Sequence, residues 1–195
     1  APASPLGVSR ELLRKEVKVT IKFAIITCSD TRTMETDEAG QKLEQLIAEQ
    51  GWECVRRVVE MDERPFIAGA LIDACDNTDA DIVLTCGGSG LSLRDVTPEA
   101  TRDVADREVP GIAEAMRAHS VAITPFAMLS RAICAQRGHT LIINLPGSTK
   151  AATENWEGIV AALPHAVKMM AGEGHSTQKD LSEKLAAAAA RGELG

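Results

Sequence analysis

A short apolar run in the middle of the chain is followed closely by three glycines in four residues, Gly87-Gly88-Ser89-Gly90. The apolar run, Ile82-Val83-Leu84, is typical of a strand buried in a parallel sheet. The glycines let the backbone turn sharply and approach a ligand, because they carry no Cβ. Thr97 and Pro98 then predict an N-cap and the first position of a helix. A strand, a glycine turn and a helix start suit an anionic ligand, although a glycine turn by itself is often only a turn.

Strand patterns and helix patterns alternate along the rest of the chain. We expect strands at about residues 17–28, 54–59, 81–85, 130–136 and 139–145. We expect helices at about residues 37–50, from 65 onward, at 98–106, 111–120 and 149–163, the last continuing after Pro164 to 170. The alternation predicts an α/β fold in three layers, with a mostly parallel central sheet flanked by helices. Residues 1–16 are predicted to form an arm, 17–172 the domain, and 173–195 a tail or peripheral helix.

The composition disfavours nucleic acid and membrane as partners. The chain has a formal net charge of −7, and aromatic residues make up only 3% of it. An acidic chain with few aromatic side chains suits neither the backbone nor the bases of a nucleic acid. No apolar run approaches the length of a membrane span, and the first residues lack the layout of a signal peptide. We therefore expect a cytoplasmic protein with free cysteines.

Four polar segments follow the predicted strands at their carboxyl ends. They are residues 29–33, 62–63, 87–95 and 146–150. Ligands of open α/β sheets bind at this edge, so we expect the segments to converge on one site. There Asp62 and Asp95 could hold one Mg²⁺ through carboxylate oxygens. The alternatives are that Asp62 caps a helix and that Asp95 pairs with its neighbour Arg94.

Four cationic residues are candidate phosphate contacts, namely Arg32, Arg94, Arg131 and Lys150. A guanidinium group matches the oxygens of a phosphate well. Arg32 could instead lie in a surface loop, and Arg131, which we expect to begin an apolar strand, could belong to a structural ion pair. Lys150 is predicted in the first turn of a helix, where the macrodipole disfavours a cation unless phosphate is bound. Ser148 is a candidate N-cap that could also contact substrate.

The P-loop and Rossmann signatures are absent, so a nucleotide site in this chain is of another type. The chain carries a series of motifs in a fixed order: Ser29-Asp30-Thr31-Arg32-Thr33, Gly87-Gly88-Ser89-Gly90, Arg94-Asp95-Val96-Thr97-Pro98-Glu99-Ala100, Asp106-Arg107-Glu108, Leu129-Ser130-Arg131 and Asn144-Leu145-Pro146-Gly147-Ser148-Thr149-Lys150. Through these motifs the chain resembles, from about residue 23 to 170, the MoaB/MogA family of molybdenum-cofactor biosynthesis proteins. Ser89 stands where many relatives have Thr, and the end of the last motif is of the MoaB type.

The resemblance implies a molybdopterin-binding, MogA-like fold, commonly a homotrimer, and adenylylation of molybdopterin by ATP with release of pyrophosphate. Asp62 and Asp95 would be the catalytic residues and the Mg²⁺ ligands, the glycine turn would cradle the nucleotide phosphates, and Ser148 and Lys150 would face the pterin. The residues implied in binding nucleotide and pterin are Asp30, Arg32, Gly87, Gly88, Ser89, Gly90, Arg94, Glu99, Ser130, Arg131, Pro146, Gly147, Ser148 and Lys150.

Two other functions stay open at this stage. The first is a non-catalytic molybdopterin carrier or scaffold of the MoaB type, since relatives of this domain occur within larger proteins that also anchor partners. For either the enzyme or the carrier, the resemblance implies other molybdenum-cofactor biosynthesis proteins as partners. The second is a different nucleotide-binding enzyme on a similar fold, which a ligand screen would reveal.

Overall fold

The structure is a computed structural model, and it describes residues 20–172. The predicted arm at residues 1–16, the start of the first predicted strand and the tail at 173–195 lie outside these described residues. The strands are β1 (Lys22–Cys28), β2 (Glu53–Glu60), β3 (Ile82–Cys86), β4 (Arg107–Glu108), β5 (Cys134–Arg137) and β6 (Thr140–Leu145). The α-helices are α1 (Glu38–Glu49), α2 (Arg64–Asp76), α3 (Thr97–Val104), α4 (Pro110–Val121), α5 (Thr149–Ile159) and α6 (Leu163–Met170), and the 3₁₀ turns are η1 (Pro125–Leu129) and η2 (Val160–Ala162).

The strands form one six-stranded sheet in the order β2-β1-β3-β6-β5-β4. The neighbours β2, β1, β3 and β6 run parallel, whereas β5 is antiparallel to β6 and β4 is antiparallel to β5. The antiparallel step arises because only Gly138 and His139 connect β5 to β6, which is the length of a tight hairpin. The prediction of a mostly parallel α/β sheet is confirmed.

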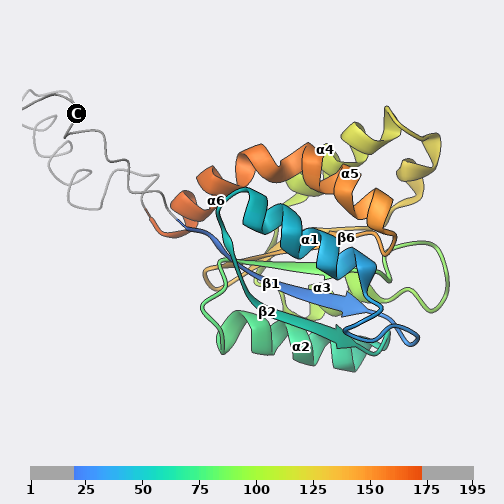
Figure 1. Cartoon of the computed structure of the whole chain (residues 1–195), viewed down its shortest axis with the longest axis horizontal. Coiled ribbons are helices and arrows are strands. Elements are labelled where there is room, and N and C mark those ends of the chain that lie inside the picture. Colours follow the sequence, from blue (N-terminus) through green and yellow to red (C-terminus); the bar gives the residue numbers. More distant parts are fainter. Residues whose placement is uncertain (1–19, 173–195) are drawn as a thin grey trace, which may run out of the picture.

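Helices cover both faces of this sheet, which gives the predicted three layers (Figure 1). Helices α1, α4, α5 and α6 pack on one face, and α2 and α3 pack on the other. Successive residues of a strand point to opposite faces, so Phe23 and Ile25 of β1 join the first core while Ala24 and Ile26 join the second. Both faces of the central strands are therefore buried, as their apolar sequences indicate.

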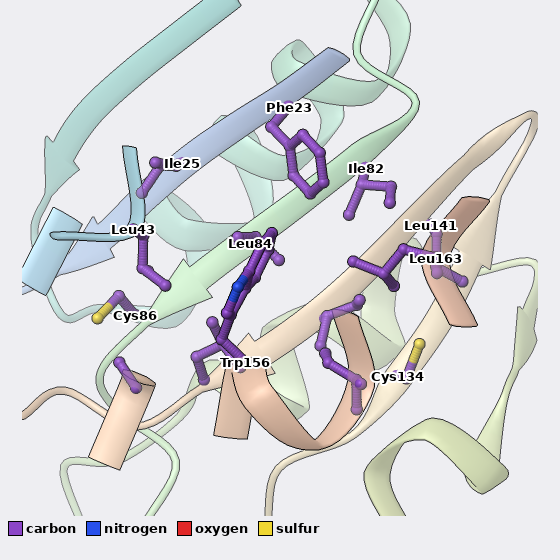
Figure 2. Packing of buried hydrophobic residues seen from close by; sticks show 14 of the residues in the cluster. Phe23, Ile25, Leu43, Ile82, Leu84, Cys86, Cys134, Leu141, Trp156 and Leu163 are labelled. Atoms are coloured by element: carbon purple, nitrogen blue, oxygen red, sulfur yellow. The ribbon is translucent and has the colours of Figure 1, made fainter. Parts of the chain in front are cut away.

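Trp156 of α5 is the largest fully buried side chain on the first face of the sheet. Its ring lies 5.7 Å from the ring of Phe23, centroid to centroid, in a tilted arrangement. Figure 2 shows Trp156 among side chains from the strands and from α1, including Leu84 and Leu43. This packing fixes α1 and α5 over the sheet, and the loops that lead into these two helices belong to the candidate site.

Several local predictions need correction. Val96 is the N-cap of α3, so Thr97 is already helical and Pro98 is the second helical position. Strand β5 begins only at Cys134, which leaves Arg131 in the segment before it. The predicted helix at 149–170 is divided by η2, because Pro164 lacks the N–H that a continuous helix would use. The short elements β4 and η1 were not predicted.

Within residues 20–172, none of the helices combines the length and the apolar character needed to cross a membrane.

Candidate functional site

The glycine turn after β3 packs directly against the loops that follow β1 and β6. Gly87 has φ +110° and Gly88 has φ +63°, conformations that L side chains rarely adopt. A Cβ on Gly87 would lie 2.6 Å from the carbonyl oxygen of Cys28, and one on Gly147 would lie 3.2 Å from the Cα of Gly87. The three loops therefore meet at a point that has no room for side chains, as the convergence of parallel strand ends predicts.

Both candidate acids lie against this turn. A Cβ on Gly88 would be 2.7 Å from Asp62 Oδ1, and a Cβ on Gly90 would be 2.7 Å from Asp95 Oδ2. The amide nitrogen of Gly90 donates a hydrogen bond to Asp95 Oδ2 at 2.6 Å. The helix-capping alternative for Asp62 is wrong, because the N-cap of α2 is Glu63. The two carboxylates thus flank the backbone bend from different loops.

The environment of Asp62 disfavours its negative charge. Burial raises the pKa of Asp62, the charges of Asp95 and Asp30 raise it further, and only Arg94 opposes them. Among the described residues, Asp62 Oδ1 is buried and has no hydrogen-bond partner, and the same holds for Thr97 Oγ1. A buried carboxylate oxygen without a donor is costly unless a cation compensates it. The donor set therefore fits a cation that prefers oxygen ligands, such as Mg²⁺.

The described residues contain no group of three or more His, Cys, Asp or Glu side chains able to hold a metal ion. Mg²⁺ often uses only one or two protein carboxylates, with substrate phosphates and waters as its other ligands. A site built on Asp62 and Asp95 would thus be completed by a phosphorylated ligand.

Arg94 links the loops that follow β1, β2 and β3. Its Nη2 donates to Asp30 Oδ2 at 2.6 Å and to Glu63 Oε1 at 3.4 Å. Asp30 Oδ1 in turn accepts a hydrogen bond from the amide nitrogen of Asp62 at 3.0 Å. These contacts replace the Arg94–Asp95 pair that was one alternative from the sequence. The side chain of Arg94 is still 63% exposed, so it remains accessible to an anion.

Arg32 connects the first loop to the loop after β6. Its Nη1 donates to the carbonyl oxygen of Gly147 at 2.9 Å and lies 3.9 Å from a carboxylate oxygen of Asp37. Asp37 is fully buried and caps α1 by accepting a hydrogen bond from the amide of Gly40. Arg32 therefore connects two loops of the site, and the alternative of a simple surface-loop residue does not describe it.

Each guanidinium nitrogen of Arg131 donates a hydrogen bond to a protein acceptor. Its Nε donates to the carbonyl oxygen of Gly90 and its Nη2 to that of Asp95, each at 2.6 Å. Its Nη1 donates to Glu99 Oε1, so the structural ion pair that was the alternative for Arg131 is present. Glu99, which we expected to bind ligand, is its partner.

A cavity of about 490 Å³ opens beside the glycine turn. Its far wall comes from residues that the sequence did not single out, including Arg117 and Ser120 of α4, Phe126 of η1 and Asn155 of α5. Asn155 and Ser120 are buried and joined by a hydrogen bond of 3.1 Å. The sequence signal that could have identified them as site residues is a polar residue on the inner face of each predicted helix. The expected site residues that line the cavity are Gly87, Gly88, Ser89, Gly90, Asp95, Ser130, Pro146 and Gly147.

The start of α5 forms the last part of the site. Ser148 is its N-cap, as predicted, and its Oγ accepts a hydrogen bond from the amide of Ala151 at 3.2 Å. Lys150 lies in the first turn with its side chain 84% exposed, 3.8 Å from Glu154, which lines the cavity. The lysine is thus a solvent-accessible cation close to the cavity.

Comparison with known proteins places this chain in a family. The family model described as "Probable molybdopterin binding domain" matches residues 24–165. A molybdopterin adenylyltransferase of Helicobacter pylori is 36% identical over 157 residues, covering 78% of this chain and 89% of its own length. The molybdenum cofactor biosynthesis protein B of Halalkalibacterium halodurans is 40% identical over 146 residues, covering 74% of this chain and 86% of its own.

Two further matches bear on architecture. The crystal structure of the molybdopterin biosynthesis enzyme MoaB from Thermus thermophilus has a TM-score of 0.73 and 40% identity, covering 78% of this chain and 98% of that one. The molybdenum cofactor synthesis protein cinnamon of Drosophila melanogaster is 38% identical over 168 residues, covering 84% of this chain. The chain spans only 28% of the length of cinnamon, so this domain also occurs as part of a longer protein.

Proposed function

Because the chain belongs to the probable molybdopterin binding domain family, and its structural relatives include MoaB and MogA, we propose that it adenylylates molybdopterin with Mg-ATP. The family resemblance expected from the sequence motifs is confirmed, and with it a role in molybdenum cofactor biosynthesis. The proposal extends this role to a defined reaction at the carboxyl edge of the sheet.

In the proposed reaction, an oxygen of the terminal phosphate of molybdopterin attacks the α-phosphorus of ATP. A new P–O bond forms, the bond between the α-phosphorus and the bridging oxygen to the β-phosphorus breaks, and pyrophosphate leaves. Reactions of this kind depend mainly on positioning and on stabilising negative charge. Arg94 and Lys150 are the exposed cations beside the site that could bind phosphate oxygens. The bare turn at Gly87 and Gly88 would let ligand phosphates approach backbone N–H groups.

Asp62 and Asp95 would hold Mg²⁺, and the bound metal would screen the phosphate charges and favour departure of pyrophosphate. The support for this assignment is the unpartnered, buried Oδ1 of Asp62 together with its raised pKa. Asp30 would keep Asp62 in place through the hydrogen bond that it accepts from the amide of Asp62.

The single observation that carries the proposal is the placement of two carboxylates from separate loops against one glycine-rich backbone bend. Purified protein with Mg-ATP and molybdopterin should release pyrophosphate. Asp95→Ala should abolish turnover with only modest loss of pterin binding. Asp103→Ala is the matched control, since Asp103 is an exposed acid paired with Arg64 outside the site. Unchanged turnover in Asp95→Ala would exclude the role assigned to that carboxylate.

The second candidate function is a non-catalytic molybdopterin carrier or scaffold. This chain matches only 28% of the length of cinnamon, so the domain there is part of a larger protein. That arrangement favours a carrier or scaffold role. A carrier would bind molybdopterin with no dependence on nucleotide and would release no pyrophosphate. We also propose the homotrimer that the family implies, which sedimentation would report as three copies of the 20.7 kDa chain.

A further inference from the structure

The loop of residues 89–95 has little apolar packing to hold it in place. It runs from the glycine turn to the start of α3 and carries Arg94 and Asp95. Leu91 and Leu93 are its two large apolar residues, and they are 64% and 100% exposed. A loop without buried apolar side chains depends on hydrogen bonds for its conformation.

Arg131 supplies hydrogen bonds at both ends of this loop. Its Nε binds the carbonyl oxygen of Gly90, where the loop leaves the turn, and its Nη2 binds that of Asp95, where the loop meets α3. Its backbone amide also donates to the carbonyl oxygen of Ser89 at 2.9 Å. Because one rigid guanidinium joins the two ends, it fixes their separation.

Glu99 fixes the guanidinium in turn. It accepts from Arg131 Nη1 and lies in the first turn of α3, where a carboxylate is favoured. The side chains of Arg131 and Glu99 are only 33% and 31% exposed, so solvent screens this pair less than a surface pair. A continuous series of contacts therefore connects α3, through Glu99 and Arg131, to the loop.

We propose that Arg131 is a positioning residue that holds the carboxylate of Asp95 in place, a role that rests on the proposed function of Asp95 as a metal ligand. The carboxylate of Asp95 is bound to the amide of Gly90, and Arg131 binds the carbonyl groups of these same two residues. Each guanidinium nitrogen donates to a protein acceptor, so in this proposal Arg131 acts on the ligand through the loop. Lysine cannot replace it, because a single ammonium lacks the planar fork.

Arg131→Lys should loosen the loop and weaken metal-dependent nucleotide binding. Hydrogen exchange measured on peptides covering residues 89–95 should become faster. Binding of Mg²⁺ with α,β-methylene-ATP, followed by calorimetry, should weaken by about 10–100-fold, which is typical when a residue that orients a metal ligand is lost. Binding of the analogue without Mg²⁺ should change much less.

Arg137→Lys is the matched control. Arg137 also uses three guanidinium nitrogens, two on Asp76 and one on the carbonyl oxygen of Val104, and its side chain is 27% exposed. It ends β5 opposite the first residue of β6, so it lies at the other edge of the sheet. This variant should lose a similar amount of stability while exchange in the loop and binding of the analogue stay as in the wild type.

Faster hydrogen exchange in the loop and weaker binding of the analogue in Arg131→Lys alone would support the inference. Equal exchange rates and equal affinities in Arg131→Lys and Arg137→Lys would overturn it. If Arg131→Lys does not fold, Glu99→Gln removes the charge of its partner and should produce the same changes at smaller size. Wild-type protein that does not bind the Mg²⁺ analogue would refute the proposed function instead, and the exchange comparison would still decide whether Arg131 holds the loop.

Discussion

Gly88→Ala tests whether the close approach at the glycine turn is real. The new Cβ would lie 2.3 Å from Thr97 Oγ1 and 2.7 Å from Asp62 Oδ1, so both side chains would have to move. Overpacking of this kind costs about 1–3 kcal/mol. The positive φ of +63° adds a cost of about 1–2 kcal/mol for a residue with a Cβ. We expect the free energy of unfolding to fall by about 2–5 kcal/mol in total.

Gly138→Ala separates the two costs. Gly138 has a similar φ of +54°, but an added Cβ would meet nothing within 4 Å. This control should therefore lose only the backbone cost of about 1–2 kcal/mol. Urea denaturation of both variants gives the two free energies, and each kcal/mol should also appear as a shift of about 2–4 °C in Tm.

The difference between the two variants is the cost of the contact with Thr97 and Asp62. Equal losses of stability in Gly88→Ala and Gly138→Ala would refute the close approach. Gly88→Ala should also lose adenylylation, because it displaces Asp62, whereas Gly138→Ala should retain it. Retained activity in Gly88→Ala at reduced stability would separate Asp62 from the reaction.

Three further predictions concern stability. Asp62→Asn should be more stable than the wild type at pH 7 without Mg²⁺. The pKa of Asp62 is raised in the folded protein, so protonated Asp62 contributes stability at low pH, and this contribution is lost as the pH rises through the folded pKa. The advantage in Tm should disappear below about pH 4; the same advantage at all pH values would contradict this explanation. Gly69→Ala in α2 should raise the free energy of unfolding by about 0.5–1 kcal/mol in urea denaturation, because an added Cβ meets nothing within 4 Å. A lower free energy of unfolding would show that the new methyl group makes an unfavourable contact. Asn144→Ala should lower the free energy of unfolding by about 1–3 kcal/mol for each buried group left unpaired, namely the hydroxyl of Thr85, which accepts from Asn144, and the amide of Ile133, which donates to Asn144. Thr101 also loses Asn144 as a donor but keeps its own hydrogen bond to the carbonyl oxygen of Thr97. An unchanged midpoint would show that the groups of Thr85 and Ile133 find other partners.

The general architecture could be predicted because it depends on local patterns. The apolar runs of β1 and β3 and the helical spacing of residues such as Leu43 and Ile47 mark the central strands and α1. Given parallel strands, their carboxyl ends must share one edge, so Asp62 and the glycine turn were expected on the same edge of the sheet. Neither step requires knowledge of a distant contact.

The remaining parts depend on contacts that the local sequence does not encode. The partner of Arg131 is Glu99, which lies 32 residues earlier, and their pairing requires α3 and the segment before β5 to be placed first. The far wall of the cavity likewise joins Phe126 of η1 to Asn155 of α5. The 3₁₀ turn η1 is too short to show a periodic pattern, which explains why its contribution to this wall was missed.

The four cationic residues show how contacts that the local sequence does not encode affect function. All four were candidates for phosphate binding, because residue type fixes the charge of a side chain but not the partners that it finds in the fold. In the structure, Arg32 binds the carbonyl oxygen of Gly147 and Arg131 binds two carbonyl groups of the loop, so these two arginines organise the site. Arg94 and Lys150 are 63% and 84% exposed and remain accessible to a ligand. The burial of each cation and its partners therefore divide the four residues into two that shape the site and two that can recognise an anion.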